Sequence, residues 1–131
     1  MPGMSETPAP HPALERPAAA AAVPVPEPAP LLTVLRAVSD PMRLAVLKEL
    51  ADGSYPPVMS LAKKLHCHPD MMGRHLQRLL KAGLVRRVNP GQEADQRSKY
   101  YQIPLEFRST LPDGTRVLDL GHCVLRFAPV G

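Results

Sequence analysis

The sequence is short of cysteine and has no long apolar run, and each absence excludes a class of protein. Only Cys67 and Cys123 are present, too few and too far apart for a disulfide scaffold, which favours a reducing cytoplasm. No stretch approaches the roughly 20 apolar residues that a membrane span needs. The Ala/Pro-rich start lacks the basic segment and compact apolar run of a secretory signal. We therefore expect a soluble, cytoplasmic protein without a membrane partner.

Signatures of common catalytic sites are missing as well. The sequence has no Gly-rich phosphate loop, no Gly-x-Ser-x-Gly nucleophile turn and no pair of carboxylates placed in a plausible cleft. We expect the protein not to be an enzyme and to need no cofactor.

Proline is abundant but unevenly distributed. Residues 1–30 contain nine of the 17 prolines and are otherwise rich in alanine, so they cannot supply the large apolar side chains of a core. We expect them to form a disordered tail. They hold one of the 16 Lys and Arg residues and three of the 12 Asp and Glu residues, which leaves 15 basic and 9 acidic side chains in residues 31–131. A folded unit with this charge of +6 suits a polyanionic partner such as nucleic acid.

Apolar residues recur at helical spacing from Leu31 onward. The spacing predicts a short amphipathic helix over residues 31–39. A second helix is expected to begin at Pro41, where the missing N–H costs nothing, with the Asp40 carboxylate as its N-cap. Asp52-Gly53 ends it. Four of its side chains are expected to face the core: Leu44, Val46, Leu47 and Leu50.

A short helix, a polar turn and a longer helix follow. Ser60 is a good N-cap residue and predicts a helix from Ser60 to Leu65. After the turn His66-Cys67-His68, Pro69 opens a helix over residues 69–82, which Gly83 closes. The pattern then becomes that of strands, at residues 84–88 and 98–103, around a polar loop at residues 89–97.

The remaining residues also have the pattern of β structure. Pro112-Asp113-Gly114-Thr115 is a turn sequence between candidate strands at residues 105–110 and 116–120. Residues 123–127 either extend the second strand past a bulge at Gly121 or form a third strand, and the sequence leaves both possibilities open.

This order of elements is typical of a winged helix-turn-helix, which places its second helix in the DNA major groove. Between Ala37 and Tyr101 the sequence resembles the ArsR-like transcriptional regulators. The resemblance lies in Ser39-Asp40-Pro41-Met42-Arg43-Leu44, Leu61-Ala62-Lys63-Lys64-Leu65, Arg74-His75-Leu76 and Lys81-Ala82-Gly83-Leu84-Val85. The predicted fold class is α+β: a disordered tail (1–30), a winged helix-turn-helix DNA-binding domain (31–103) and a β-rich C-terminal extension (104–131).

The resemblance implies a sequence-specific regulator that binds double-stranded DNA, with repression as the expected outcome. At 100° per residue, Met72, Leu76, Leu79 and Leu80 occupy one arc of the long helix, opposite a polar and charged arc. In the family the start of this helix reads base edges. The helix residues thereby assigned to DNA contact are His68, Asp70, Met71, Arg74, Gln77, Arg78 and Lys81.

In the family the hairpin wing, here about residues 84–103, follows the DNA backbone or minor groove. Arg97 and Lys99 can neutralise phosphates there, as can Arg86 and Arg87, although strand alternation places these two on opposite faces. Glu93 and Asp95 at the loop tip would weaken a close approach.

Gly73 departs from the family pattern, which usually has a serine at this position. A glycine costs about 1 kcal/mol of helix propensity relative to alanine and offers no hydroxyl to a phosphate. It indicates either close packing against a neighbouring helix or the loss of one DNA contact.

The resemblance also raises the possibility of a metal-responsive sensor. His66, Cys67 and His68 are consecutive, and such residues rarely converge on one tetrahedral ion. The family's Cys-x-Cys motif is absent from residues 60–65. Three further candidate ligands are His75, His122 and Cys123. We nevertheless expect no metal site. His68 is better explained as a helix cap or DNA contact, and Cys67 as a small core side chain.

Two further possibilities concern partners. A winged helix that binds protein instead of DNA would present an exposed apolar patch in place of the basic stripe. Family members usually dimerise through their first and last helices, and a last helix is not predicted here. We expect a homodimer in which the β extension replaces that helix, or else an extension that packs on its own domain. The candidate interface residues are Leu118, Leu120, Val124, Leu125 and Phe127.

Overall fold

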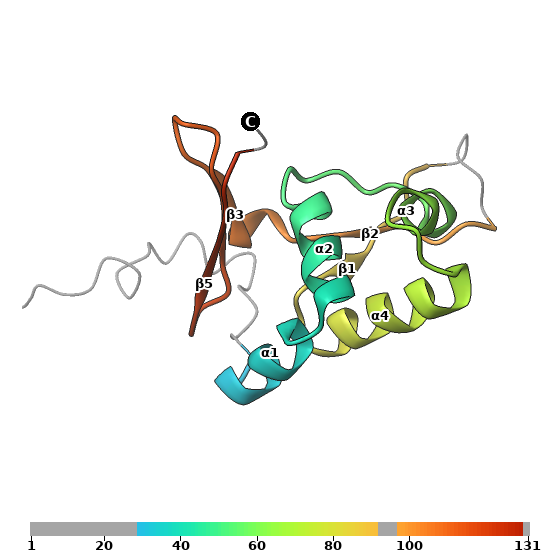
Figure 1. The fold of residues 1–131 in the computed structure, drawn as a ribbon, viewed down its shortest axis with the longest axis horizontal. Coiled ribbons are helices and arrows are strands. Elements are labelled where there is room, and N and C mark those ends of the chain that lie inside the picture. Colours follow the sequence, from blue (N-terminus) through green and yellow to red (C-terminus); the bar gives the residue numbers. More distant parts are fainter. Residues whose placement is uncertain (1–28, 92–96, 130–131) are drawn as a thin grey trace, which may run out of the picture.

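A computed structural model of the protein describes residues 29–91 and 97–129. The predicted tail lies outside the described residues except for Ala29 and Pro30, and so does the loop tip with Glu93 and Asp95. Four helices and a two-stranded wing lie on one side of the molecule and a separate three-stranded sheet on the other (Figure 1). None of the helices in the described part is long and apolar enough to cross a membrane.

The first two helices form as the sequence predicts. Helix α1 (Leu31–Val38) buries Val34, Ala37 and Val38, and α2 (Pro41–Leu50) begins after Asp40, whose carboxylate accepts a hydrogen bond from the Arg43 backbone N–H. Leu44 was expected in the core, but it is exposed, because α2 buries only the arc that carries the three residues Val46, Leu47 and Leu50.

Helix α3 (Val58–Lys64) begins two residues before the predicted start. Pro57 occupies the N-cap position, so Ser60 lies inside the first turn and is not the cap. The Val58 backbone N–H donates to the Lys99 carbonyl, and Pro57 forms a bridge with Tyr100, so the segment leading into α3 is held against the wing. That long-range contact decides where the helix starts.

Helix α4 (Pro69–Lys81) follows the turn at residues 66–68, where His66 adopts a φ of 55°. The His68 ring is its N-cap and accepts a hydrogen bond from the Asp70 backbone N–H, as one interpretation of the sequence required. Gly83, with a φ of 79°, ends the helix as predicted. The buried arc consists of Met72, Leu76 and Leu79, while Leu80 is only partly buried.

The two strands of the wing are shorter than predicted. Strand β1 (Arg86–Arg87) pairs antiparallel with β2 (Tyr101–Gln102), so Arg87 lies opposite Tyr101. Asn89-Pro90 follows the first strand and Pro104 the second, and proline cannot donate a hydrogen bond to a neighbouring strand. The regular ladder is therefore confined to the base of the wing.

The C-terminal extension forms its own sheet in the order β3-β4-β5 (Arg108–Thr110, Arg116–Asp119 and Val124–Phe127). Residues 123–127 thus supply a third strand, and Gly121, with a φ of 94°, lies in the turn before it. The first candidate strand was predicted too long, because Leu105–Phe107 form a 3-10 helix, η4, after Pro104. The sheet stands apart from the wing (Figure 1).

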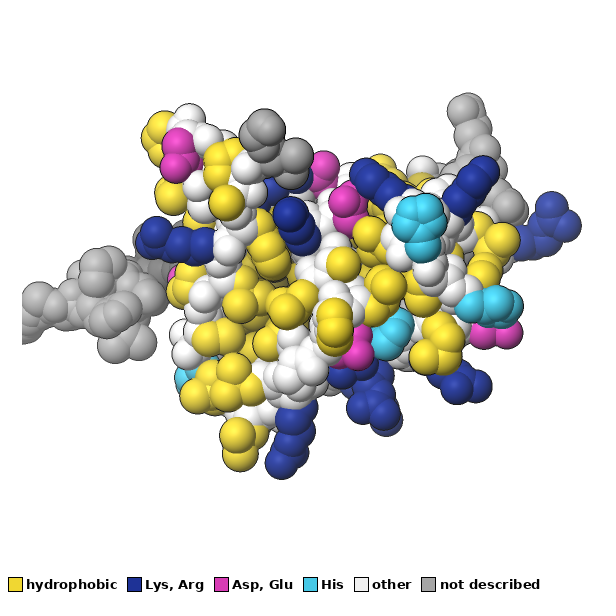
Figure 2. All heavy atoms as spheres, viewed as in Figure 1, with side chains coloured by type: hydrophobic (Ala, Val, Ile, Leu, Met, Phe, Trp, Pro, Cys, Tyr) yellow, Lys and Arg dark blue, Asp and Glu magenta, His cyan; other side chains and the backbone are white. Residues whose placement is uncertain are grey.

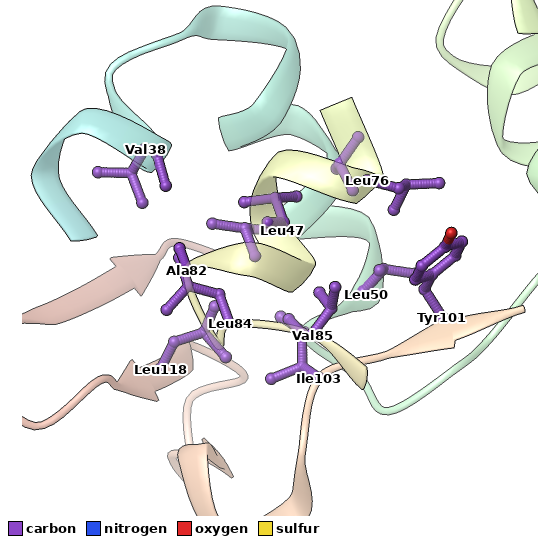
Figure 3. Packing of buried hydrophobic residues seen from close by; sticks show 14 of the residues in the cluster. Val38, Leu47, Leu50, Leu76, Ala82, Leu84, Val85, Tyr101, Ile103 and Leu118 are labelled. Atoms are coloured by element: carbon purple, nitrogen blue, oxygen red, sulfur yellow. The ribbon is translucent and has the colours of Figure 1, made fainter. Parts of the chain in front are cut away.

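A single cluster of aliphatic side chains joins both halves of the molecule. Leu47, Leu76 and Ile103 come from α2, α4 and the end of the wing, and Leu118 of β4 packs with them (Figure 3). Leu118 and Leu120 are both buried in this cluster. Of the two possibilities for these residues, a dimer interface and packing on their own domain, the structure shows the second, and they fix the extension to the helices.

Candidate nucleic-acid interface

A groove of about 1290 Å³ runs along the exposed face of α4. Its floor is the arc of α4 opposite the buried arc, and its walls come from α1, the start of α3 and the second half of the wing. The α4 residues lining it recur at helical spacing: Pro69, Asp70, Gly73, Arg74, Gln77, Arg78 and Lys81.

The groove brings together most of the residues predicted to contact DNA. Arg97 and Lys99 of the wing line it, together with five predicted residues of α4: Asp70, Arg74, Gln77, Arg78 and Lys81. His68 and Met71 lie outside the groove lining, exposed at the beginning of α4. Arg86 and Arg87 are exposed on β1 and do not line the groove either.

The charge of the groove is strongly positive. Among the described residues, six Arg and Lys side chains line it against one carboxylate, that of Asp70. One of the six, Arg36 of α1, was not among the predicted residues, because nothing in the local pattern of α1 distinguishes it from a solvated helix residue. Only the packing of α1 beside α4 places Arg36 at the groove wall. A focused positive field of this kind attracts polyanions.

Gln77 and the two wing arginines have partners within the protein. Gln77 Nε2 donates a hydrogen bond of 2.8 Å to the Tyr101 hydroxyl, which joins α4 to the wing. The Arg87 guanidinium lies 5.5 Å from the centre of the Tyr101 ring, in cation–π contact. Arg86 donates to the side-chain carbonyl of Gln102. Tyr101 was not singled out in the sequence, and its role follows only from the paired register of the two strands.

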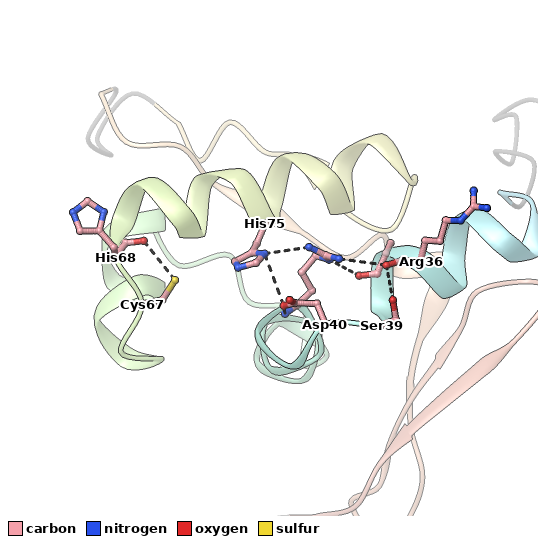
Figure 4. Close-up of polar contacts among 8 residues, drawn as sticks. Arg36, Ser39, Asp40, Cys67, His68 and His75 are labelled. Carbon is pink, nitrogen blue, oxygen red and sulfur yellow. Dashed lines mark hydrogen bonds and ion pairs between the residues drawn. The ribbon is translucent and has the colours of Figure 1, made fainter.

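A polar cluster fixes α4 against the first two helices (Figure 4). The Arg43 guanidinium donates to the Ala37 and Arg36 carbonyl oxygens at the end of α1 and lies 3.3 Å from Nδ1 of His75 on α4. Because arginine has only donors, this contact is a hydrogen bond in the tautomer that leaves Nδ1 of His75 without a proton. The cluster therefore sets the position of α4, and with it the arginines on the exposed face of the helix.

Asp40 completes this cluster. The Arg43 backbone N–H that donates to the Asp40 carboxylate holds its pKa below the usual 3.8, partial burial opposes this shift, and the charges of His75 and Arg43 reinforce it. His75 Nδ1 lies 3.9 Å from the Asp40 carboxylate. The carboxylate is therefore ionised at neutral pH and serves both as a helix cap and as a counter-charge.

Gly73 lies on the floor of the groove. A Cβ atom built on Gly73 would have no neighbouring atom within 4 Å, so no helix packs against this position. Of the two interpretations of Gly73, close packing is wrong. The missing side chain leaves a hollow on the exposed face of α4.

The candidate metal ligands are dispersed over the fold. The Cys67 thiol donates to the His68 carbonyl oxygen, His68 caps α4 and His75 belongs to the Arg43 cluster (Figure 4). His122 and Cys123 lie in the turn between β4 and β5. Within residues 29–91 and 97–129, no group of three or more His, Cys, Asp or Glu side chains is placed to hold a metal ion.

Comparison with solved structures identifies the architecture. A homodimeric winged helix-turn-helix DNA-binding domain from Mycobacterium bovis, described as a possible ArsR-family transcriptional regulator, matches with a TM-score of 0.50 and 25% identity. The match covers 58% of this chain and 65% of the Mycobacterium domain. The fold is a winged helix-turn-helix. This winged helix is similar to an ArsR-like regulator, as its sequence motifs predicted.

Two further structures are also similar to this winged helix. HlyU from Vibrio vulnificus, a transcriptional regulator, has 25% identity and a TM-score of 0.48 over 57% of this chain and 72% of its own. HlyU from Vibrio cholerae has 24% identity and a TM-score of 0.48 over 57% of this chain and 76% of its own. No protein-family model and no curated protein matches the sequence.

Proposed function

We propose that the protein is a cytoplasmic, sequence-specific regulator of transcription that binds double-stranded DNA and acts as a repressor, by binding and not by catalysis. The observation that carries this proposal is the groove along α4, which six basic side chains and one carboxylate line in the part of the chain that the structure describes. An α-helix fits the major groove of B-DNA, and winged helices insert the second helix of the motif, which is α4 here.

In this proposal the floor and the walls of the groove contact different parts of the duplex. Arg74 and Arg78 lie one turn apart on the exposed face of α4, where arginine can contact guanine O6 and N7. Arg97 and Lys99 of the wing, together with Arg36, neutralise backbone phosphates. His68 and Met71 lie at the end of α4 that would enter the DNA first. Arg86 and Arg87 extend the basic surface of the wing.

We infer that the protein acts as a homodimer. An apolar surface is visible between the helices and the C-terminal sheet (Figure 2); α1 exposes Leu31, Leu32 and Leu35, and β5 carries the partly buried Leu125 and Phe127. Two-fold dimers present two recognition helices about one helical turn apart. The Mycobacterium domain is described as homodimeric, which supports the same assembly here.

The proposed function is tested by removing basic side chains from the groove and from a surface remote from it. Arg74→Ala and Arg78→Ala are each expected to weaken DNA binding by about 1–3 kcal/mol, because each removes a base or phosphate contact. The control is Arg126→Ala, which removes the same charge from the exposed face of β5. Affinities are measured by fluorescence anisotropy over a range of salt concentrations, with circular dichroism to verify folding.

The comparison between variants separates the alternatives. Equal affinities for wild type, Arg74→Ala and Arg78→Ala, with folding intact, would refute the assignment of α4 as the recognition helix. Equal weakening by Arg126→Ala would mean that net charge, and not the groove, attracts DNA. Wild-type protein without salt-dependent DNA affinity would leave a protein-binding winged helix as the better hypothesis.

A further inference from the structure

We propose that Tyr101 is a positioning residue that orients the Gln77 amide to read an adenine, and that the hollow at Gly73 gives the base edge room to reach it. This inference rests on the proposed DNA-binding function. It assigns a base to one position of the half-site and gives the wing strand β2 a role in specificity.

The contact between Gln77 and Tyr101 joins an exposed side chain to a buried one. Gln77 is exposed on the groove floor, whereas Tyr101 is only 2% exposed, and the two are joined by the hydrogen bond of 2.8 Å. A free glutamine on a helix surface samples many rotamers, and ordering one costs about 1–2 kcal/mol of conformational entropy. The bond to Tyr101 orders the Gln77 side chain before DNA binds.

The hydrogen-bonding inventory of the Gln77 amide fits adenine. An amide has two N–H donors and one carbonyl acceptor, and Tyr101 occupies one donor. The remaining donor and the carbonyl oxygen match N7 and the N6 amino group of adenine, the bidentate pair that glutamine forms in the major groove. Arg74 and Arg78 have no acceptor, so neither can satisfy the adenine amino group.

Gly73 lies one helical turn before Gln77 on the same strip of α4. Both residues line the groove, and a Cβ at Gly73 would have no neighbour within 4 Å. Helical side chains lean toward the N-terminus, so the Gln77 side chain leans toward position 73, and a longer residue there would lie next to its amide. The glycine keeps this approach open.

Tyr101 is itself held in place from two sides. The Arg87 guanidinium lies over its ring, and β1 pairs with β2 so that Arg87 and Tyr101 are directly opposite. A rigid hydroxyl on a buried ring is a better orienting partner than a mobile surface group.

The experiment measures base preference with three variants. Tyr101→Phe removes only the hydroxyl, and Gln77→Ala removes the amide that is proposed to contact adenine. Gly73→Leu places a side chain in the open space at Gly73, and leucine is compatible with a helix. Each full-length protein is used to select from a pool of duplexes with a randomised half-site, and affinities for the selected site and its single-base variants are then measured. Tyr55→Phe is the control, because Tyr55 is a half-exposed tyrosine that does not line the groove.

We expect wild type and Tyr55→Phe to prefer adenine at one position by roughly 5- to 150-fold, the discrimination of one bidentate pair. Gln77→Ala should abolish this preference, and Tyr101→Phe and Gly73→Leu should each reduce the ratio of affinities for adenine and the other bases severalfold. In Gln77→Ala/Tyr101→Phe the second change should have no further effect on base preference, because the two residues act as one unit.

The outcomes distinguish this inference from the proposed function. If wild type binds a specific site and Tyr101→Phe keeps the full base profile, the positioning role of Tyr101 is overturned. It is also overturned if Tyr101→Phe weakens all sequences alike, as a purely structural residue would. If wild type has no affinity for any duplex, the proposed function itself fails, and that result is seen before any variant is made.

Discussion

The wing and the C-terminal sheet are both antiparallel β units, yet they are attached to the helices by different interactions. The wing is joined to α4 by the hydrogen bond from Gln77 to Tyr101, and to the end of α2 by a bond from the Gln102 side chain to the Gly53 carbonyl. The C-terminal sheet is held by Leu118 and Leu120, which are buried in the core. Both units bury side chains in the core, and the sheet also has an ion pair of 3.6 Å from Arg116 to Asp52, so what distinguishes the wing is the hydrogen bond that ties it to α4.

The difference matches what each unit presents to the outside. Hydrogen bonds fix the angle of the wing while its arginines and lysine remain exposed beside the groove. The sheet covers the core with one face, so its contribution is to stability and to the apolar surface near α1 (Figure 2). Sequence reasoning treated both as β structure, and only the contacts distinguish a surface for a polyanion from a cover for the core.

The largest expected effect is on the apolar attachment of the sheet. Leu118→Ala should lower the free energy of unfolding by about 2–5 kcal/mol, because it leaves a cavity in the cluster that joins the two halves. Val124→Ala, at a half-exposed position of β5, should change it by less than about 0.5 kcal/mol. Urea unfolding measures both. Equal, small effects would mean that the sheet is not integral to the core.

The next effect is on assembly through the sheet. Leu125 and Val124 are adjacent on β5 and point to opposite faces, Leu125 toward the core side. Leu125 is only partly buried in its own domain, so we expect a wild-type dimer in which the partner covers the rest of this side chain. Leu125→Glu should dissociate it, because a carboxylate buried without a partner is costly, and Val124→Glu on the opposite face should leave it intact. Analytical ultracentrifugation gives the masses, and circular dichroism verifies the fold. Wild-type protein that remains monomeric at roughly tens of micromolar would contradict the dimer model.

A smaller effect concerns the helical framework that both β units pack against. Asp40→Ala should cost about 1 kcal/mol of stability at neutral pH through loss of the α2 cap. The folded pKa of Asp40 is lowered, so its stabilising contribution is present above 3.8 and is lost as pH falls through the folded pKa. Urea unfolding at neutral and acidic pH should show this acid-dependent loss in wild type, and less of it in Asp40→Ala. Parallel pH profiles for the two proteins would disprove the role of Asp40.

The smallest effect is expected outside both units. Deleting residues 1–28 should change the free energy of unfolding and the DNA affinity by less than about 0.5 kcal/mol, because a Pro/Ala-rich segment has little apolar surface to bury. Thermal unfolding and anisotropy on the truncated chain measure the two quantities. A substantial loss of stability would show that the segment packs on the domain.

Local signals predicted the helices well. Asp40-Pro41 and His68-Pro69 each place a cap before a proline, so the starts of α2 and α4 follow from short-range chemistry. The start of α3 could not be predicted in this way, because it depends on a hydrogen bond from the Val58 backbone N–H to the carbonyl of Lys99, some forty residues away. The exposed position of Leu44 also depends on which neighbours surround α2.

The candidate site likewise has some features that the sequence predicts and others that only the structure shows. The polar arc of α4 follows from helical periodicity, and the structure places Arg74, Gln77 and Arg78 along one groove. Arg36 and Tyr101 could not be identified from the sequence, because their roles depend on α1 lying beside α4 and on the register of β1 and β2. Gly73 was noticed as a departure from the family pattern, but only its empty surroundings show that it is a hollow.

The sequence by itself determined the order of elements, the caps of α2 and α4 and the faces of α4, because these depend on dihedral preferences and on interactions between residues close in the chain. The tertiary structure decided that Leu118 and Leu120 belong to the core, that Tyr101 holds Gln77 and that residues 123–127 form a separate strand. These features depend on contacts between distant segments. Such contacts are selected by packing and strand register over the whole domain, and no local pattern encodes them.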